Sequence, residues 1–268
     1  MESSESVARP DQQLVISNRF SLTGRIAVVT GAARGIGRAA AAALGEQGAT
    51  LLLVDVLAED VCRIKDDLAE RGIRAKALPG DVVDKGMHDE IMRVTAEVGP
   101  VSILVNAAGV MRRTNATELT IEDLDFLWQV NVVGTVAITQ RLLPQMVEHG
   151  YGKIINIGSL GSVRGLERRT AYAATKGAIA QYTVSLASEV GKHGVRVNAI
   201  APGYVDTDMT APWIYGNPER TANLLARIPL GRFADPADLA GVFIFLAAPA
   251  SDYVTGQILL VDGGWTTT

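Results

Sequence analysis

The feature that most constrains the fold is a regular alternation between short, β-branched apolar runs and longer stretches with helical periodicity. The apolar runs are continuous rather than alternating with polar residues, as expected when both faces of a strand are covered. They occupy residues 25–30, 50–55, 74–78, 101–106, 153–157, 195–200 and 257–261. Helical stretches lie between them at 35–47, 57–71, 85–98, 120–148, 170–192 and 235–248. This order predicts an α/β, doubly wound fold, with a seven-stranded, mostly parallel sheet and helices on both faces.

The pattern indicates one domain behind a short polar extension. Residues 1–20 are polar and show no sustained period, whereas residues 21–268 carry the alternation without a linker or an internal repeat. We therefore expect an N-terminal extension over 1–20 and a single domain over 21–268. Residues 202–231 are irregular and rich in proline. Because long connections in compact domains are commonly functional lids, we expect a lid over about 204–230, with a helix near 219–227.

Composition excludes several classes of protein. With 48% hydrophobic and 20% charged residues, the chain differs from disordered and fibrous proteins, and its net charge of -4 offers no basic footprint for nucleic acid. No apolar run approaches the roughly 18 residues needed to cross a bilayer. The first residues lack a secretory signal, and the single cysteine, Cys62, allows no intrachain disulfide. We expect a cytoplasmic protein without a nucleic-acid or membrane partner and, because its three histidines are dispersed, without a metal site.

Glycines concentrate directly after the first predicted strand. The run Thr30-Gly31-Ala32-Ala33-Arg34-Gly35-Ile36-Gly37 leads into an alanine-rich helix. Glycine permits a tight turn and a close approach of the backbone to a pyrophosphate, and the helix N-terminus supplies free N–H groups. Glycine also serves purely structural turns, so the spacing alone leaves both interpretations open. Its place after the first strand favours a dinucleotide site on a Rossmann-like domain, with these candidate binding residues: Gly31, Arg34, Gly35, Ile36 and Gly37.

An acidic residue ends the second predicted strand. The Asp55 carboxylate is placed to accept hydrogen bonds from both ribose hydroxyls of NAD and to repel a 2′-phosphate. Arg34 favours the opposite choice, because a guanidinium beside the adenosine can pair with that phosphate. No basic residue follows Asp55, where Val56 and Leu57 stand. We predict NAD as the cofactor, with NADP kept open by Arg34.

A second informative pattern is Ser159 followed by Tyr172 and Lys176. Tyr172 and Lys176 are four residues apart, so on a helix they share one face. The ordinary pKa of tyrosine is near 10, and a neighbouring lysine cation lowers it, which suits general acid–base chemistry. Ser159 ends a predicted strand, where ligands gather in open α/β sheets, and can hydrogen-bond a substrate oxygen. The alternative is a common amphipathic helix with a Tyr/Lys pair.

From Phe20 onward, the chain resembles the short-chain dehydrogenase/reductase family. The matching motifs are Thr30-Gly31-x3-Gly35-x-Gly37, Gly80-Asp81-Val82, Asn106-Ala107-Ala108-Gly109, Asn131, Ser159, Tyr172-x3-Lys176 and Pro202-Gly203. The resemblance implies hydride transfer between a nicotinamide cofactor and an alcohol or ketone. Tyr172 would exchange a proton with the substrate oxygen, which Ser159 would orient. Lys176 would bind the nicotinamide ribose and lower the pKa of Tyr172, and Asn131 would anchor a water in the proton relay.

The resemblance also implies further cofactor contacts. Asp81 and Val82 would flank the adenine, and Thr207 would bind the nicotinamide amide. The other cofactor-binding candidates are Asn106, Ala107, Gly109, Tyr172, Lys176, Pro202, Gly203 and Val205. The family commonly has Asn-Asn-Ala-Gly, and here Ala107 stands at the second position, so one hydrogen bond of that motif is in question.

Arginines gather on the expected substrate side. They follow the Asn106–Gly109 motif and recur between Ser159 and Tyr172. Arginine clusters are commonly solvated surfaces, but arginine also suits a carboxylate. The candidate substrate residues are Arg113, Arg164, Arg168 and Trp213. The strings at 110–113 and 254–265 are similar to the branch of the family that comprises the gluconate and 2-dehydro-3-deoxy-gluconate 5-dehydrogenases.

The sequence therefore predicts an NAD(H)-dependent oxidoreductase that interconverts a secondary alcohol and a ketone of a small-molecule substrate, a sugar acid or a polyol. One alternative is an NADPH-dependent 3-oxoacyl thioester reductase, which Asp55 disfavours and Arg34 keeps open. Another is a non-catalytic dinucleotide-binding regulatory protein, which would not require Tyr172. The resemblance also implies a homotetramer with interfaces on the helices at 120–148 and 170–192 and on the C-terminal strand.

Overall fold

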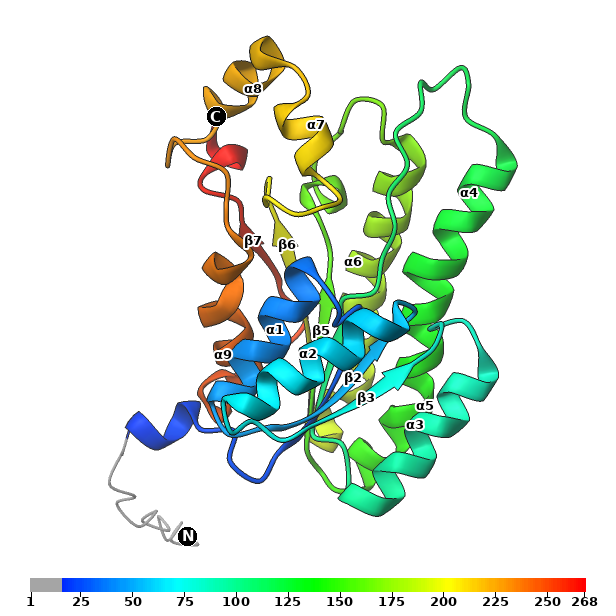
Figure 1. Ribbon diagram of the computed structural model, residues 1–268, viewed down its shortest axis with the longest axis vertical. Helices are drawn as coiled ribbons and strands as arrows, with labels where there is room; N and C mark the ends of the chain where they lie inside the picture. The colour runs from blue at the N-terminus through cyan, green and yellow to red at the C-terminus, as the bar shows by residue number, and fades with distance from the viewer. Residues whose placement is uncertain (1–15) are drawn as a thin grey trace, which may run out of the picture.

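The computed structural model describes residues 16–268, in which helices cover both faces of one seven-stranded sheet (Figure 1). The strand order is β3-β2-β1-β4-β5-β6-β7, and all neighbouring strands are parallel. The strands are β1 (Ile26–Thr30), β2 (Thr50–Asp55), β3 (Ala75–Pro79), β4 (Ile103–Asn106), β5 (Gly152–Ile157), β6 (Val195–Pro202) and β7 (Ile258–Val261). The predicted doubly wound α/β fold is confirmed, and this sheet is wholly parallel. Winding reverses between β1 and β4, and open α/β sheets bind ligands at the carboxyl edge near such a point.

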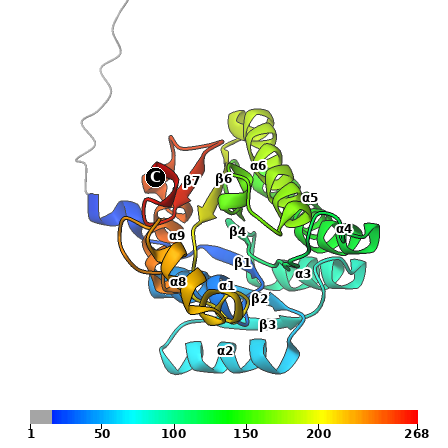
Figure 2. The same ribbon diagram turned by 90° about the horizontal axis from the view of Figure 1, so that it is seen from above.

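Two helical layers bury the two faces of the sheet, as the view from above shows (Figure 2). One layer contains α1 (Gly35–Glu46), α2 (Ala58–Glu70) and α9 (Ala240–Ala247), and the other contains α3 (Lys85–Val98), α5 (Thr135–Glu148) and α6 (Thr170–Val190). Successive strand residues point to opposite faces, so Val29 joins the first core and Val28 the second. Because both faces are covered, every residue of β1 is buried, which explains the continuous apolar runs.

The long helix predicted over residues 120–148 is divided into three parts. Helix α4 (Ile121–Trp128) begins where predicted, and the Asp123 N–H donates to the Thr120 hydroxyl at 3.1 Å. A π-helical turn follows at Gln129–Gly134 and leads into α5. Such turns are rare and are frequent at functional sites. This one contains Asn131, whose side chain is 1% exposed.

The segment at residues 204–230 contains two short helices above the carboxyl edge of the sheet (Figure 1). Helix α8 (Pro218–Leu225) matches the helix predicted near 219–227. Helix α7 (Ala211–Tyr215) has five residues, too few for a periodic signal in the sequence. A small apolar cluster joins this segment to the chain terminus and to the loop after β5; it contains Leu160, Tyr204, Ile214, Ile228 and Trp265.

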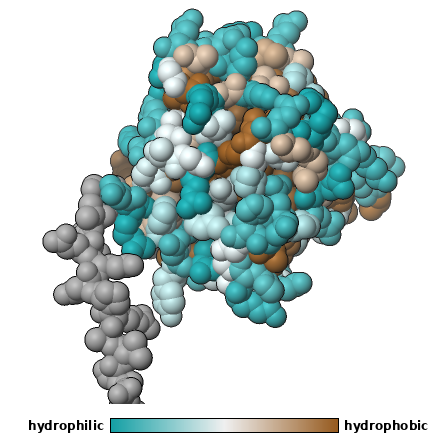
Figure 3. All heavy atoms as spheres, turned by 90° about the horizontal axis from the view of Figure 1, so that it is seen from below, coloured by the Kyte–Doolittle hydropathy of each residue, from teal (hydrophilic) through white to brown (hydrophobic). Residues whose placement is uncertain are grey.

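The first described element is a 3₁₀ helix at Ile16–Phe20, and its Arg19 guanidinium donates to the Pro249 carbonyl at 2.7 Å. The rest of the predicted extension, residues 1–15, lies outside the described residues. Within residues 16–268, no helix is long and apolar enough to cross a membrane, and no group of three His, Cys, Asp or Glu side chains could hold a metal ion. Seen from below, the surface is mainly hydrophilic, with apolar residues in small groups (Figure 3).

Candidate active site

A cavity of about 390 Å³ opens at the carboxyl edge of the sheet. Its walls come largely from the loops that follow the strands, together with the first turns of α1 and α6. The predicted residues that line it are Gly31, Arg34, Gly35, Ile36, Gly37, Asp55, Asp81, Val82, Ala107, Gly109, Arg113, Ser159, Tyr172, Lys176, Pro202, Gly203, Val205 and Thr207. Motifs that are far apart in the sequence therefore meet in one place.

The glycine-rich turn after β1 forms part of this wall. Gly31 has a φ of +66°, and a Cβ there would lie 2.8 Å from the backbone of Ala108. Gly35 has a φ of +52°, and a Cβ on it would lie 3.3 Å from Cγ2 of Thr207. Side chains at these positions would fill the cradle between the turn and the facing loops. The turn, together with the free N–H groups at the start of α1, fits a pyrophosphate.

The end of β2 supplies the predicted ribose contact. Asp55 is 7% exposed; its Oδ2 accepts from the Ala33 N–H at 2.9 Å, and its Oδ1 accepts from the Leu57 N–H at 3.0 Å. Each oxygen keeps a further lone pair for a ligand hydroxyl. Arg34 is exposed on the same cavity wall. The residues therefore fit a nicotinamide dinucleotide, which accepts or donates the hydride when it is bound.

Two polar residues, at the ends of β1 and β4, hold neighbouring parts of the chain in place and do not line the cavity. The hydroxyl of Thr30, which the sequence motifs do not single out as a ligand, accepts from the N–H groups of Ala107 and Ala108, both at 3.1 Å. Nδ2 of Asn106 donates to Thr139 Oγ1 at 3.1 Å and to Asn156 Oδ1 at 2.9 Å. Asn106 is 3% exposed and does not line the cavity. It links strand β4 to β5 and α5, so the structure does not bring Asn106 into the cavity with the other residues predicted to bind the cofactor.

Helix α6 brings Tyr172 and Lys176 to the cavity beside Ser159. Lys176 is 5% exposed; its Nζ donates to the Ile157 carbonyl at 2.7 Å and lies 5.8 Å from the centre of the Tyr172 ring. Oγ of Ser159 accepts from the Gly161 N–H at 3.1 Å. That bond uses a lone pair and leaves the hydroxyl proton of Ser159 for another acceptor. The group therefore combines a phenol, a hydroxyl donor and a buried ammonium.

Ser162 holds this group together, although no sequence motif points to it. Its Oγ accepts from the Ser159 N–H at 3.2 Å and donates to the Lys176 carbonyl at 2.9 Å. The backbone of Ser159 is thereby tied to helix α6, one turn beyond Tyr172. The relative placement of hydroxyl and phenol is set by this bridge.

Burial raises the pKa of the Tyr172 phenol above its ordinary value. The Ser159 side chain, as a hydrogen-bond partner, and the positive charges of Arg169 and Arg113 act in the opposite direction. Lys176 is not among these influences, and burial lowers its own pKa to about 8. In this structure the cations that lower the pKa of Tyr172 are arginines, and the expected effect of Lys176 on it stays a prediction.

Asn131, in the π-turn, lies directly behind the cavity wall. Its Oδ1 accepts from the Val110 N–H at 2.8 Å, while its Nδ2 donates to the Val110 carbonyl at 3.0 Å and to Thr175 Oγ1 at 3.1 Å. A Cβ on Gly109 would lie 3.3 Å from Asn131 Oδ1 and 3.6 Å from Lys176 Nζ. Asn131 thus fixes the loop after β4 against helix α6. Its role in anchoring a water stays a prediction.

The structure divides the candidate substrate arginines. Arg113 lines the cavity, whereas Arg164 and Arg168 are exposed and do not line it. Arg164 instead donates to the Thr266 carbonyl at 3.4 Å. Arg169, which the predicted set omits, is 9% exposed and lines the cavity. It precedes Tyr172 by three residues, so the helical period is the sequence signal that could have identified it.

Trp213, on α7, lies behind the arginines and does not line the cavity. The Arg220 guanidinium lies 3.9 Å from the centre of a Trp213 ring, and that of Arg113 lies 4.9 Å from it. Arg169 is held separately, with its Nη2 donating to the Tyr204 hydroxyl at 2.9 Å. Within residues 16–268, no carboxylate oxygen lies within 4.0 Å of the nitrogens of these three arginines.

Comparison with known proteins places this site in a family. The family described as enoyl-(acyl carrier protein) reductase matches residues 31–266. The 5-keto-D-gluconate 5-reductase of Escherichia coli (strain K12) is 38% identical over 250 residues, which are 93% of this chain and 98% of that protein. A 3-oxoacyl-(acyl-carrier-protein) reductase of Thermotoga maritima is 36% identical over 252 residues, 91% of this chain and 98% of that protein.

A solved structure agrees in both sequence and fold. It is a gluconate 5-dehydrogenase from Burkholderia cenocepacia J2315 in complex with NADP and tartrate. It is 35% identical, with a TM-score of 0.90, and the match covers 94% of this chain and 98% of that one. Since fold, motifs and relatives agree, the chain belongs to the short-chain dehydrogenase/reductase family and is an NAD(P)-dependent oxidoreductase that interconverts a secondary alcohol and a ketone.

Proposed function

We propose that the chain oxidises the secondary alcohol of a sugar acid, or reduces the corresponding keto acid. The observation that carries this proposal is the pair Arg113 and Arg169, which lines the cavity beside Tyr172 without a carboxylate partner in the described residues. A substrate carboxylate would supply that partner, and arginine binds carboxylates through two parallel hydrogen bonds. The sugar-acid names of the relative from Escherichia coli and of the solved structure support the same substrate class.

The charges around Arg113 favour an anionic ligand. Burial lowers the pKa of Arg113 to about 10, and repulsion from Arg169 and Arg220 acts in the same direction. Grouping buried cations costs free energy unless an opposite charge is present. An anion bound at Arg113 would relieve that cost. The protein therefore holds a site whose electrostatics are completed by a negatively charged substrate.

Unpaired hydrogen-bond donors indicate a substrate rich in acceptors. Seven buried side-chain nitrogens or oxygens have no partner in the described chain, and two of them are donors on residues that line the cavity. These two are Nε of Arg113 and Nε of Arg169. Buried donors are usually satisfied, so bound carboxylate and hydroxyl oxygens, or ordered water, are expected there. A polyhydroxy acid supplies more acceptors than an acyl thioester.

The proposed roles of the catalytic residues follow from their positions. Tyr172 is the general acid and base, and Ser159 donates its free proton to the reacting oxygen. Lys176 contacts the nicotinamide ribose, and Asn131 fixes the loop that carries Gly109. The cavity-lining residues of the glycine turn and of the loops after β2, β3, β4 and β6 bind the cofactor. We assign the Asp55 carboxylate to the ribose hydroxyls, which makes NAD the preferred form.

The proposal includes the setting of the site. Residues 21–268 form one catalytic domain in which the segment at 204–230 acts as a lid that excludes water. The chain assembles as a homotetramer in the cytoplasm. Support for the assembly comes from exposed apolar side chains on the helical faces expected at the interfaces, among them Ile121, Trp128, Val133 and Val184.

The test is turnover of a panel of sugar acids, neutral polyols and a 3-oxoacyl thioester, each with the NAD and the NADP forms of the cofactor. We expect the highest kcat/KM for a sugar acid with NAD. Arg113→Gln should lower kcat/KM for acids about 10- to 100-fold, the value of a charge-assisted hydrogen bond, and should leave polyols nearly unchanged.

Three outcomes would contradict the proposal. Preferred turnover of the thioester with NADPH would assign the enzyme to acyl reduction instead. Equal effects of Arg113→Gln on acids and on polyols would remove the carboxylate contact. Tight cofactor binding without turnover of any compound would indicate a regulatory protein.

A further inference from the structure

Arg169 occupies an unusual place for a buried arginine. It stands immediately before helix α6, three residues ahead of Tyr172, is 9% exposed and lines the same cavity. Its Nη2 donates to the Tyr204 hydroxyl at 2.9 Å, and its Nε is buried without a partner among the described residues. A buried cation without an acidic partner is costly, so its presence here points to a task at this site.

The backbone beside Arg169 is strained. Arg168 has a φ of +58° and is the one non-glycine residue of the described chain with a positive φ. Its carbonyl accepts from the Thr114 N–H at 3.0 Å, which holds the strained turn against the loop after β4. Such a conformation costs on the order of 1 kcal/mol in a non-glycine residue and clusters at functional sites. Here it accompanies a reversal of side-chain direction: Arg168 is exposed and Arg169 is buried in the cavity wall.

The charged and titratable groups around Tyr172 come from several elements. Helix α6 contributes Lys176, whose Nζ is bonded to the Ile157 carbonyl, and Arg169 stands just before that helix. The loop after β4 contributes Arg113, and the segment after β6 contributes Tyr204 and Asp208. The remaining charged groups on the cavity wall are Arg34, Asp55 and Asp81. Arg169 and Arg113 are the cations that lower the pKa of Tyr172.

We propose that Arg169 is a positioning residue for the proton transfer: its guanidinium, fixed by Tyr204 and three residues ahead of Tyr172, stabilises the Tyr172 phenolate. In the reducing direction, the O–H bond of Tyr172 breaks and a new O–H bond forms on the substrate oxygen, while the carbonyl carbon accepts a hydride from NAD(P)H. Tyrosine is left as the phenolate and regains a proton from solvent. The inference rests on the proposed role of Tyr172 as the general acid and base.

A consequence is that the charge of the substrate changes the pH dependence. Oxidation requires the Tyr172 phenolate, so turnover rises with pH through the pKa of Tyr172 in the complex. An anionic substrate bound between Arg113 and Arg169 neutralises the charge that lowers this pKa. The acid limb of kcat should therefore lie at higher pH for an acid substrate than for a neutral polyol.

The experiment compares pH profiles of alcohol oxidation for the wild type and for three variants, Arg169→Gln, Arg169→Lys and Arg168→Gln, with the best acid and the best neutral substrate. Loss of a nearby opposite charge moves a pKa by about one unit or more. Arg169→Gln should therefore shift the acid limb of kcat/KM upward by about one pH unit. Arg169→Lys should restore most of the wild-type position, and Arg168→Gln, the exposed neighbour, should leave it unchanged.

Controls separate the possible outcomes. Tyr172→Phe should lose turnover by at least about 100-fold; if it does not, the proposed role of Tyr172 fails, and this inference fails with it. If Tyr172→Phe is inactive but the limb of Arg169→Gln coincides with that of the wild type, the inference alone is overturned. If Arg169→Gln does not fold, Tyr204→Phe, which removes the hydroxyl that holds Arg169, should shift the limb upward by a smaller amount, and an unshifted limb overturns the inference.

Discussion

Two buried lysines near opposite ends of strand β5 have opposite surroundings. Lys153, at the beginning of the strand, is 1% exposed and donates to Ser251 Oγ at 3.1 Å and to Asp252 Oδ1 at 2.8 Å. Lys176 is 5% exposed and donates to the carbonyl of Ile157, the last residue of the same strand, at 2.7 Å. No carboxylate lies near Lys176 in the described residues. One cation is paired within the protein, and the other is not.

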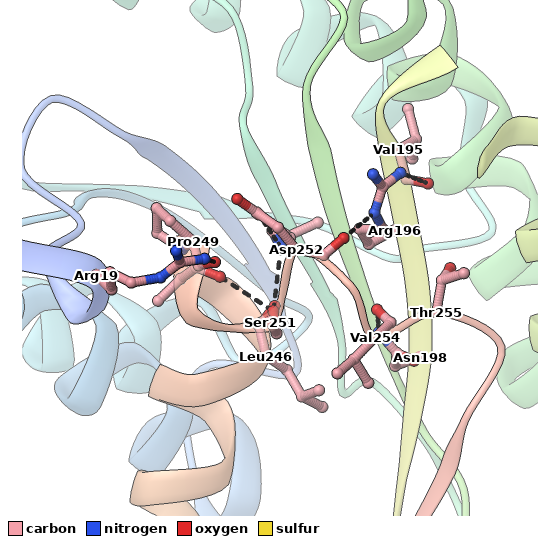
Figure 4. Close-up of polar contacts among 12 residues, drawn as sticks. Arg19, Val195, Arg196, Asn198, Leu246, Pro249, Ser251, Asp252, Val254 and Thr255 are labelled. Carbon is pink, nitrogen blue, oxygen red and sulfur yellow. Dashed lines mark hydrogen bonds and ion pairs between the residues drawn. The ribbon is translucent and has the colours of Figure 1, made fainter. Parts of the chain in front are cut away.

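The surroundings of Lys153 consist of a closed set of hydrogen bonds on the segment between α9 and β7. Oγ of Ser251 donates back to carbonyls of the preceding turn, and the Asp252 carbonyl accepts from Arg196 Nε at 2.6 Å (Figure 4). The pKa of Lys153 is lowered by burial, and its hydrogen bond to Asp252 offsets part of that effect. A buried charge satisfied in this way stabilises one arrangement of the chain and leaves nothing to bind a ligand.

The two ends of the sheet differ in whether their buried cations have acidic partners. The cations at the carboxyl edge, namely Lys176, Arg113 and Arg169, are buried or half-buried without acidic partners in the described chain, and the cation at the amino end of β5 has one. Active sites commonly hold groups that are unsatisfied until a ligand arrives. Removing Lys176 and breaking the Lys153–Asp252 pair should therefore have opposite consequences for activity and stability.

The largest expected effect is on turnover in Lys176→Met. Loss of the ammonium should lower kcat by about 10²- to 10⁴-fold, the usual size of a general acid–base contribution. The melting temperature should not fall, because the substitution removes an unpaired buried cation. Steady-state kinetics and thermal denaturation of the same preparation provide the measurement. A melting temperature lowered together with kcat would show that Lys176 is structural, as Lys153 is.

An effect of about 3 kcal/mol is expected in the pH dependence of stability. Burial lowers the pKa of Lys176 from 10.5 to about 8, which corresponds to a penalty of roughly 3 kcal/mol. Below pH 8 the lysine is charged in both folded and unfolded states, and the penalty is present in full. Between pH 8 and 10.5 the unfolded state binds more protons, so the free energy of unfolding rises with pH in this window. The penalty is gone above it.

Urea denaturation of the wild type and of Lys176→Met over this pH range isolates the effect. Lys153 is present in both proteins, so its own titration cancels. We expect the wild type to gain stability relative to Lys176→Met as the pH rises from 8 to 10.5. A constant difference between the two proteins would mean that Lys176 is not desolvated as the structure indicates.

Some features of the fold can be predicted from the sequence, and others cannot. Strand β2 and helix α3 fall on the predicted residues, 50–55 and 85–98, because continuous apolar runs and helical periods are local signals. The π-turn inside the predicted helix at 120–148 has no such signal. It accompanies the side-chain bonds of Asn131 to Val110 and Thr175, which lie far away in the sequence. Nothing in the local pattern predicts it.

Within the site, motif spacing identifies most of the residues that line the cavity. The direction in which a neighbouring side chain points cannot be predicted in the same way. Asn106 belongs to a predicted motif, yet its partners Thr139 and Asn156 are 33 and 50 residues away and turn it into the core. Arg168 and Arg169 are adjacent and chemically identical. Only Arg169 of the two lines the cavity, and the backbone φ of +58° at Arg168 that accompanies this arrangement is not visible in the sequence.

The smallest effect is expected at the paired lysine. Asp252→Ala removes the carboxylate and leaves the buried Lys153 cation with Ser251 as its remaining side-chain acceptor in the described chain. Because Asp252 is 49% exposed and water can replace part of the contact, we expect a loss of about 1–2 kcal/mol rather than the larger cost of a fully buried pair. The kcat should stay unchanged. The matched control is Asp67→Ala, which breaks the exposed pair with Arg38 at 3.9 Å and should cost less than about 0.5 kcal/mol. Urea denaturation measures the free energy of unfolding of both variants. Equal losses of stability would mean that the Lys153–Asp252 pair contributes no more than an exposed pair, which would contradict the contrast with Lys176.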